Sequence, residues 1–317
     1  MEKRLLDWTE QEFMQFGHRN QLSRHYLHET PAFDEAALIE ILDRHPRELL
    51  GIFTMGSDPT KIHEWRLVEP GDATGQEIYD AVRRGRIFLN TLFTERSSDP
   101  IASLMQQVFT ELRERSPAMR YAHDASATLI LSSPGIQVYY HMDVEPNILW
   151  HIRGRKRAWV YPALDFRIVD QQQLEAIFAG EAEHEDLPFD PAWDSLGTCF
   201  ELKPGDVLSW PLSSPHRVLN DTMNVTLSTN YSTPESRRRI AIQTANRRLL
   251  RPLGIRRPSA AERGLRATVK CAALALSNRL RRQAHQARPP RMAELRLDPN
   301  AESGWAPLDR PIEASFR

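Results

Sequence analysis

The chain has 317 residues, of which 41% are hydrophobic and 26% are charged. This length can bury a large hydrophobic core, and the composition excludes a disordered chain, a coiled coil and a small disulfide-rich protein. Two cysteines are present, which is typical of a reducing compartment. No apolar run reaches the roughly 18–20 residues of a membrane helix, and the N-terminal segment lacks a signal-peptide core. We therefore expect a cytoplasmic protein without a membrane partner.

Charge is distributed unevenly, although the formal net charge is only −1. Residues 1–236 contain 22 Lys and Arg against 36 Asp and Glu, whereas residues 237–292 contain 16 Lys and Arg and one acid, Glu262. This asymmetry indicates that the basic segment meets an acidic partner. That partner could be nucleic acid, an acidic protein or the acidic body of the same chain, and the sequence leaves all three open.

Residues 1–122 are predicted to be mainly helical and to pack on the core. In FDEAALIEILDRHP, apolar side chains recur at helical spacing until Pro46, which ends the pattern. In PIASLMQQVFTELRER the same spacing is stronger, and Pro100 stands in the expected first turn. We expect both apolar stripes to be packing surfaces rather than binding sites.

Residues 123–235 are predicted to form short strands. Their segments are rich in β-branched and aromatic residues and are separated by Pro, Gly, Asn and Asp. A series of this kind favours a double-sheet jelly roll or barrel over a parallel α/β sheet, with the acidic segment 163–197 as an excursion between strands. The eight segments are ATLILSS, IQVYYHMD, NILWHIRG, KRAWVYP, GTCFELK, DVLSWP, HRVLN and NVTLSTNYS.

Residues 236–317 are predicted to form a basic helical extension that ends in a loosely ordered tail of 25 residues. Within it, the segment 265–280 carries an apolar stripe at helical spacing, and most of its cations fall off that stripe. Such a basic amphipathic helix could pack on the core, pair with a second subunit or lie on a polyanion. The stripe consists of Leu265, Val269, Ala272, Leu276 and Leu280.

The sequence YYHMD contains the most informative histidine. Residues i and i+2 of a strand point to the same face, so His141 and Asp143 are directed at one point. One further histidine would complete a 2-His-1-carboxylate triad, which is typical of non-haem Fe(II) oxygenases because three positions stay open. His216, which opens a later strand, is the candidate. A second H-x-D, at residues 184–186, has no strand pattern around it and is interpreted as solvated surface.

A basic turn, GRKR, separates two apolar strands. It could be an ordinary hairpin turn, or one of its cations could point into the barrel and bind an anionic co-substrate. Lys is a compact point charge that suits a carboxylate at the end of a deep pocket. Strand alternation places Ala158 and Val160 on the face of Lys156, with Trp159 opposite. This pattern permits an inward Lys156.

These segments together resemble a known family. HMDVEPNILWHIRGRKRAWVYP followed by LKPGDVLSWPLSSPHRV resembles the JmjC-like, cupin-type Fe(II)/2-oxoglutarate dioxygenases, and among them the hydroxylases related to the asparaginyl hydroxylase of hypoxia-inducible factor. The similarity covers about residues 124–235. It is carried, in order, by H-x-D, an Asn four residues after the Asp, G-x-K-R, PGD, and a distal His 75 residues after the first. It implies a mainly β fold with flanking helices around a double-stranded β-helix core.

The resemblance also implies roles for individual residues. His141, Asp143 and His216 would ligate Fe(II), and Lys156 would pair with the distal carboxylate of 2-oxoglutarate, which reacts together with O2. Second-shell partners should orient both histidines, but the sequence does not identify them.

Two asparagines match positions close to this site in the family. Asn147 matches an inward polar position beside the metal, and Asn230 matches an Asn near the co-substrate. One departure is Val138, because the asparaginyl hydroxylase has a Thr there that helps to hold 2-oxoglutarate. Another donor would have to replace it, and the candidates are Tyr139, Tyr121 and Ser228.

The activity implied by the resemblance is hydroxylation, with release of succinate and CO2. The acidic insert and the basic C-terminal segment favour a protein or peptide substrate, and a free amino acid or other small metabolite is the alternative. A non-catalytic cupin-like module is a second hypothesis, in which the basic helices bind nucleic acid or an acidic protein. No nucleic-acid-binding motif is present, and aromatic residues are sparse in residues 237–292.

Two further expectations remain. A cupin metalloenzyme that does not use 2-oxoglutarate is a third hypothesis, which Lys156 disfavours because such chemistry does not need a buried cation there.

The apolar stripe of segment 265–280 suggests a homodimer through the C-terminal helix, and some members of the family dimerise in that way.

Overall fold

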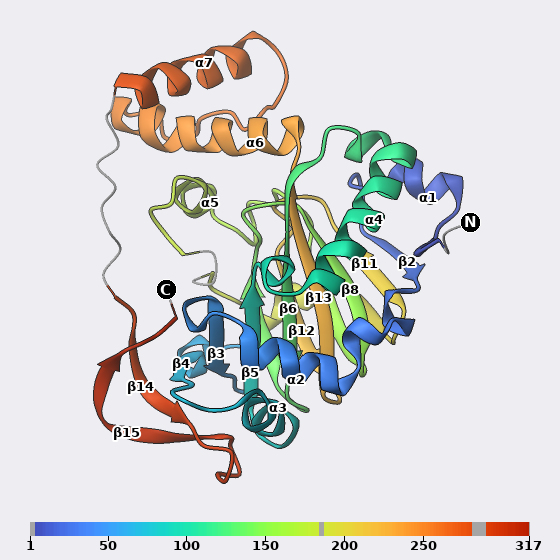
Figure 1. Ribbon diagram of the computed structural model, residues 1–317. Helices are drawn as coiled ribbons and strands as arrows, with labels where there is room; N and C mark the ends of the chain where they lie inside the picture. Colours follow the sequence, from blue (N-terminus) through green and yellow to red (C-terminus); the bar gives the residue numbers. More distant parts are fainter. Residues whose placement is uncertain (1–3, 184–186, 281–289, 317) are drawn as a thin grey trace.

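The computed structural model describes residues 4–183, 187–280 and 290–316 (Figure 1). Its strands form one large sheet and one small sheet. In the order in which neighbours pair, the large sheet consists of β1 Leu6–Asp7, β2 Gln21–His25, β11 Asp206–Ser209, β8 Asn147–Arg153, β13 Asn224–Ser232, β6 His123–Ser132, β5 Ile87–Leu92, β3 Leu50–Thr54, β4 Arg66–Glu69, β14 Met292–Leu297 and β15 Trp305–Glu313. The small sheet consists of β10 Thr198–Leu202, β9 Lys156–Val160, β12 His216–Asn220 and β7 Gln137–His141.

The jelly-roll prediction for residues 123–235 is confirmed. Each of the eight predicted segments is a strand, and four of them, in the order β11-β8-β13-β6, face the four strands of the small sheet. The mainly β fold with flanking helices is therefore as expected.

The second H-x-D copy, at residues 184–186, lies outside the described residues.

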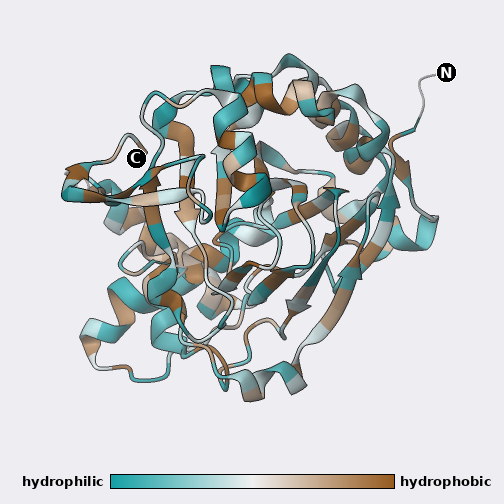
Figure 2. Cartoon of the chain, turned by 90° about the horizontal axis from the view of Figure 1, so that it is seen from below, coloured by the Kyte–Doolittle hydropathy of each residue, from teal (hydrophilic) through white to brown (hydrophobic). Residues whose placement is uncertain are grey.

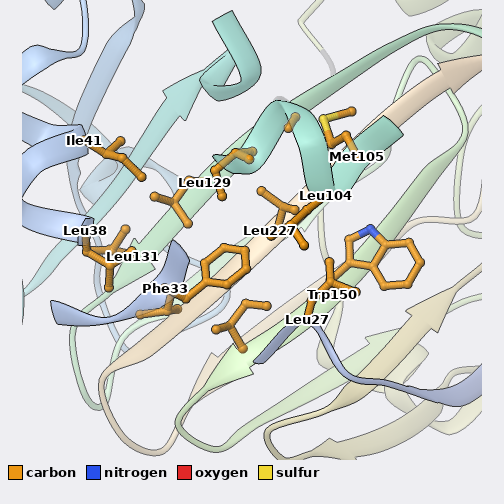
Figure 3. Close-up of a cluster of buried hydrophobic side chains, with 14 of the residues drawn as sticks. Leu27, Phe33, Leu38, Ile41, Leu104, Met105, Leu129, Leu131, Trp150 and Leu227 are labelled. Atoms are coloured by element: carbon orange, nitrogen blue, oxygen red, sulfur yellow. The ribbon is translucent and has the colours of Figure 1, made fainter. Parts of the chain in front are cut away.

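Alternation along the central strands separates the packing face of the large sheet from its inner face (Figure 2). Leu129, Leu131 and Leu227 point away from the small sheet and pack with Trp150 against the N-terminal helices (Figure 3). Apart from Ile130, the intervening positions of β6 and β13 that line the cavity carry hydroxyl and amide side chains. The large sheet thus has a dry outer side and a polar inner side.

The N-terminal region contains the expected helices, but it also contributes strands that the sequence analysis did not anticipate. Its α-helices are α1 Glu10–Gln15, α2 Glu35–Arg44, α3 Gly75–Arg84 and α4 Asp99–Arg115. β1 and β2 extend the large sheet beside β11, and β5, β3 and β4 extend it beside β6. β3 and β5 are short and almost wholly buried, so their apolar runs show no period that distinguishes strand from helix. The division of the chain near residue 122 stays a prediction.

The C-terminal region begins with two helices, as predicted, but its tail is ordered. α6 Pro234–Ala245 and α7 Leu265–Leu280 lie side by side above α5 Gln171–Phe178 (Figure 1). The expected loosely ordered tail is wrong, because β14 and β15 form a hairpin and β14 pairs in parallel with β4. Ala293, Leu295 and Leu297 alternate into the core. None of the described helices is long and apolar enough to span a membrane.

Candidate active site

The three predicted metal ligands meet at the end of the small sheet. His141 ends β7 and His216 begins β12, and the two residues are direct partners in this antiparallel pair. One possible ligand atom from each of His141, Asp143 and His216 lies within 4.8 Å of the others. The two imidazole centroids are 4.1 Å apart, and His216 Nε2 lies 3.7 Å from Asp143 Oδ2. Tertiary structure therefore joins the residues that the sequence separates by 75 positions.

Backbone carbonyls orient both imidazole rings. His141 Nδ1 donates to the carbonyl of Tyr139 at 2.7 Å, and His216 Nδ1 donates to the carbonyl of Ser214 at 3.2 Å. Because a carbonyl oxygen only accepts, each Nδ1 carries a proton, and Nε2 is the nitrogen left to coordinate a metal ion. These carbonyls are the second-shell partners that the sequence did not identify. Two such imidazoles and one carboxylate fit an Fe(II)-type ion with open coordination positions.

A cavity of about 190 Å³ lies between the two sheets and includes the three ligands in its wall. Its inner end is polar because the inward positions of β6 and β13 carry Thr, Ser and Asn side chains. Sequence reasoning missed most of these residues, although alternation on the predicted strands could have identified all but one. Asn90 could not be found, because β5 was not expected to be part of the sheet. The missed residues are Asn90, Thr128, Ser132, Asn220 and Thr226.

Lys156 points into this cavity, as the alternation permitted. It is the first residue of β9, is only 5% exposed, and donates from Nζ to Thr226 Oγ1 at 2.6 Å. No carboxylate among the described residues forms an ion pair with it, and burial lowers the pKa of Lys156 to about 7. A buried amine without an acidic partner, at the wall of a cavity, suits an anionic ligand.

The turn before Lys156 depends on Gly154. This residue has φ +90°, and a Cβ there would lie 2.2 Å from the carbonyl oxygen of Met223. Only glycine accepts both the left-handed backbone and this close approach. The GRKR segment is therefore a tight turn, but not the hairpin turn that the sequence allowed, because β8 belongs to the large sheet and β9 to the small sheet. It directs one of its cations into the cavity, and the role of that cation in binding a co-substrate stays a prediction.

The two predicted asparagines lie together in the cavity wall. Asn147 and Asn230 are paired in register across β8 and β13. Asn147 Nδ2 donates to Asn230 Oδ1 at 2.7 Å and to Ser228 Oγ at 2.6 Å. This network fixes the amide orientations, and it places Ser228, one of the three candidate replacements for the missing Thr, in the cavity.

The other two candidate replacements lie elsewhere. Tyr139 is absent from the described cavity wall: its ring stacks on Trp65 with centroids 6.1 Å apart, and its hydroxyl accepts a hydrogen bond from the Gly56 N–H at 3.0 Å. Tyr121 is 64% exposed. Val138 itself lines the cavity. The expectation for Tyr139 therefore does not match its position, because its side chain turns toward the aromatic cluster around Phe53 instead.

Known proteins match this chain in structure but not in sequence. No family model matches it, and no curated protein is significantly similar to it. YcfD, a ribosomal oxygenase from Escherichia coli, has been solved in complex with cobalt and 2-oxoglutarate; it superposes with a TM-score of 0.53 at 19% identity, covering 89% of this chain and 69% of that chain. Its complex with cobalt and succinic acid gives a TM-score of 0.51 at 19% identity, with the same coverage of both chains. The fold expected from the family resemblance is thereby confirmed.

Proposed function

We propose that this chain, which shares its fold with a 2-oxoglutarate-binding oxygenase, is an Fe(II)- and 2-oxoglutarate-dependent dioxygenase. The observation that carries the proposal is the presence, in one cavity, of the His141–Asp143–His216 cluster and an inward ammonium group without a carboxylate partner. The cluster suits the metal, and the ammonium group suits the far carboxylate of the co-substrate. Neither a structural core nor a simple binding module requires this combination.

The residues of the chain divide the work of the proposed reaction. His141, Asp143 and His216 would hold Fe(II), which supplies O2 activation when it is bound. Lys156 neutralises the distal carboxylate of 2-oxoglutarate, and Thr226 holds the ammonium group in place. The Asn147 amide network keeps the wall beside the metal in one arrangement, so that the co-substrate is oriented before reaction.

The test uses the iron-loaded full-length protein and 2-oxoglutarate. We expect saturable binding of 2-oxoglutarate and slow, iron-dependent formation of succinate even without substrate, both measurable by NMR. A metal chelator should abolish the succinate signal and leave the protein folded. If the iron-loaded protein neither binds nor consumes 2-oxoglutarate, the proposal is wrong.

The proposed substrate is a protein or peptide side chain, and a free amino acid or other metabolite is the alternative. Pockets for whole small ligands usually have volumes of about 300–1,000 Å³, whereas this cavity has about 190 Å³. The co-substrate would occupy much of that space, so the substrate must reach in from outside, as an extended side chain can. YcfD is described as a ribosomal oxygenase, which agrees with a protein substrate. A 16-Da mass gain on a free amino acid but on no polypeptide would contradict this choice.

We expect the affinity for 2-oxoglutarate to fall as the pH rises above 7. The ligand-free pKa of Lys156 is about 7, and the co-substrate dianion needs the charged form. Above pH 7 binding must take up a proton, so the dissociation constant should rise about tenfold per pH unit and level off below pH 7. His151, its nearest titratable neighbour on β8, stays neutral, because burial and then Lys156 lower the pKa of His151 to about 3.

Calorimetry at pH 6.5, 7.5 and 8.5 checks this expectation. Two buffers of different ionisation enthalpy should reveal uptake of close to one proton per 2-oxoglutarate at pH 8.5. An affinity that does not change over this range would show that Lys156 does not titrate on binding.

We also propose a homodimer through α7. This helix buries Ala267 and Leu274 against its neighbours, so most of the apolar stripe predicted for segment 265–280 faces solvent. Two copies could bury these stripes against each other across a two-fold axis. The exposed stripe residues are Leu265 at 79%, Val269 at 56%, Leu276 at 58% and Leu280 at 76%.

Light scattering tests this assembly. The wild-type chain should have twice the mass of the monomer, and Val269→Glu/Leu276→Glu should have the mass of one chain. Met14→Glu/Leu22→Glu is the matched control, because both residues are exposed apolar side chains far from α7 in the sequence. A monomeric wild-type chain would exclude the dimer. A chain truncated near Pro234 that keeps the same number of subunits as the wild type would also exclude it.

A further inference from the structure

The basic segment forms a groove that the proposed reaction does not use. The groove has a volume of about 540 Å³ and lies where the end of α6 approaches the start of α5. We call it the arginine groove, because Arg247, Arg251, Arg256 and Arg257 line it together with Gln172, Gly254 and Ile255.

The backbone around the groove is firmly held. α6 continues into a π-helical turn, Asn246–Leu250, and a 3-10 turn, Arg251–Leu253, before Gly254 reverses the chain with φ +82°. Turns of the π type are rare and often mark functional sites. The side chain of Asn246 is buried and accepts a hydrogen bond from Lys270 Nζ at 2.7 Å. This contact ties the turn to α7.

Two of the four arginines are fixed by acidic residues of the insert. Arg251 Nε lies 2.7 Å from Glu175 Oε2, and Glu175 is completely buried. Arg247 Nε lies 2.6 Å from Glu181 Oε2. Both ion pairs engage Nε, and the two terminal nitrogens of Arg247 have no hydrogen-bond partner among the described residues. The ion pair therefore holds the Arg247 guanidinium group in place, and its two terminal nitrogens can donate hydrogen bonds to a ligand.

The other two arginines have no acidic partner among the described residues. Arg256 and Arg257 are exposed, and their side chains form neither an ion pair nor a hydrogen bond with any residue in the described ranges. The groove thus combines four guanidinium groups with two carboxylates, both of which are already paired. A ligand for it must be an anion.

Other arginines of the basic segment also lack an acidic partner in the described part of the chain. The acidic body does pair with part of the basic segment, for example through Arg237 with Asp124. Arg263, Arg266 and Arg279 are exposed and have no such partner in the described part of the chain. The sequence left open whether the basic segment meets nucleic acid, an acidic protein or the acidic body of the same chain. The chain's own acids pair with only part of this segment, and the remaining cations fit an extended polyanion rather than one small anion.

We infer that the arginine groove binds the sugar–phosphate backbone of a nucleic acid. Guanidinium groups match phosphate oxygens in pairs. A partner protein would be expected to bring apolar and aromatic contacts, yet the groove offers only Ile255 as an apolar side chain. Residues 237–280 contain no Phe, Trp or Tyr on which bases could stack, so binding depends on the backbone and is insensitive to base sequence. This inference is independent of the proposed reaction.

Fluorescence anisotropy with a labelled 20-nucleotide poly(U) RNA and the full chain tests the inference. We expect binding that weakens from 50 to 200 mM KCl, with a slope of log K against log salt of about −3 for four phosphate contacts. Arg256→Glu/Arg257→Glu should weaken binding at least tenfold and make the slope less steep by about 1.4, since two contacts are lost. Succinate formation should be unchanged, which separates this result from a failure of the proposed reaction.

Arg83→Glu/Arg84→Glu, on α3, is the matched control, because it changes the net charge equally at exposed arginines elsewhere. It should bind RNA as the wild type does. If both variants lose RNA affinity equally, the effect comes from net charge alone, and the arginine groove is not the binding site. Displacement of the RNA by poly-glutamate at the same charge concentration would overturn the choice of nucleic acid in favour of an acidic polypeptide.

Discussion

Replacing Asp143 by Ala is expected to abolish 2-oxoglutarate turnover. Asp143 is the only carboxylate in the cluster, and its Oδ2 lies 3.7 Å from His216 Nε2. Without it, two imidazoles remain, and they offer neither the negative charge nor the third coordinating group that a divalent ion needs. Succinate formation should fall by about three orders of magnitude or more, in keeping with the loss of a metal ligand.

Metal binding and folding must be measured alongside activity. Co(II) or Fe(II) titration of Asp143→Ala should show strongly weakened binding, while thermal unfolding of the metal-free protein should be unchanged or shifted upward, because a partly buried charge is removed. Asp221→Ala is the matched control, since Asp221 is an exposed aspartate that forms an ion pair with Arg157. If Asp143→Ala keeps a tenth of the wild-type turnover, the metal centre is misassigned.

Replacing Lys156 by Met is expected to remove 2-oxoglutarate binding while the metal still binds. Met has a similar length and no charge, so the distal carboxylate would be buried without a counter-ion. The dissociation constant for 2-oxoglutarate should rise about 100-fold or more, which corresponds to roughly 3 kcal/mol. Co(II) affinity should stay within a factor of two, because Lys156 is not among the metal-ligating residues.

The same variant should be more stable than the wild type. Burial holds the pKa of Lys156 at about 7, below its value of 10.5 in an unfolded chain. Between these values the unfolded state binds more protons, so the lysine destabilises the fold at neutral pH, and this cost fades as the pH rises toward 10.5. A variant that is more stable but binds no co-substrate cannot be explained by misfolding. Lys203→Met, at an exposed position, is the control, and full 2-oxoglutarate affinity in Lys156→Met would refute the assigned role.

The two variants together separate the three functional hypotheses. A 2-oxoglutarate dioxygenase requires both Asp143 and Lys156. A cupin metalloenzyme with another reaction would lose its activity with Asp143→Ala and keep it with Lys156→Met. A binding module that acts through its basic helices would be indifferent to both and would respond to Arg256 and Arg257 instead.

Local patterns were enough to predict the core of this protein. Period-two alternation with turn residues identified every strand from residue 123 to 235, and most of these strands have one face against apolar side chains and one in the cavity. The H-x-D motif correctly predicted that His141 and Asp143 lie together, although β7 ends at His141 and Asp143 follows the strand. Alternation after a glycine turn likewise permitted an inward Lys156, and the family resemblance implied its role.

Tertiary structure decided everything that depends on distant neighbours. Pairing with β6 makes Ile87–Leu92 a strand and brings Asn90 into the cavity, which its own sequence does not indicate. The cluster around Phe53 draws Tyr139 out of the site. Periodicity identified the apolar stripe of α7, but packing against α6 buried the opposite face. A sequence repeat defines the faces of an element, whereas segments tens of residues away in the sequence determine which of those faces is covered, and that is a property of the folded chain alone.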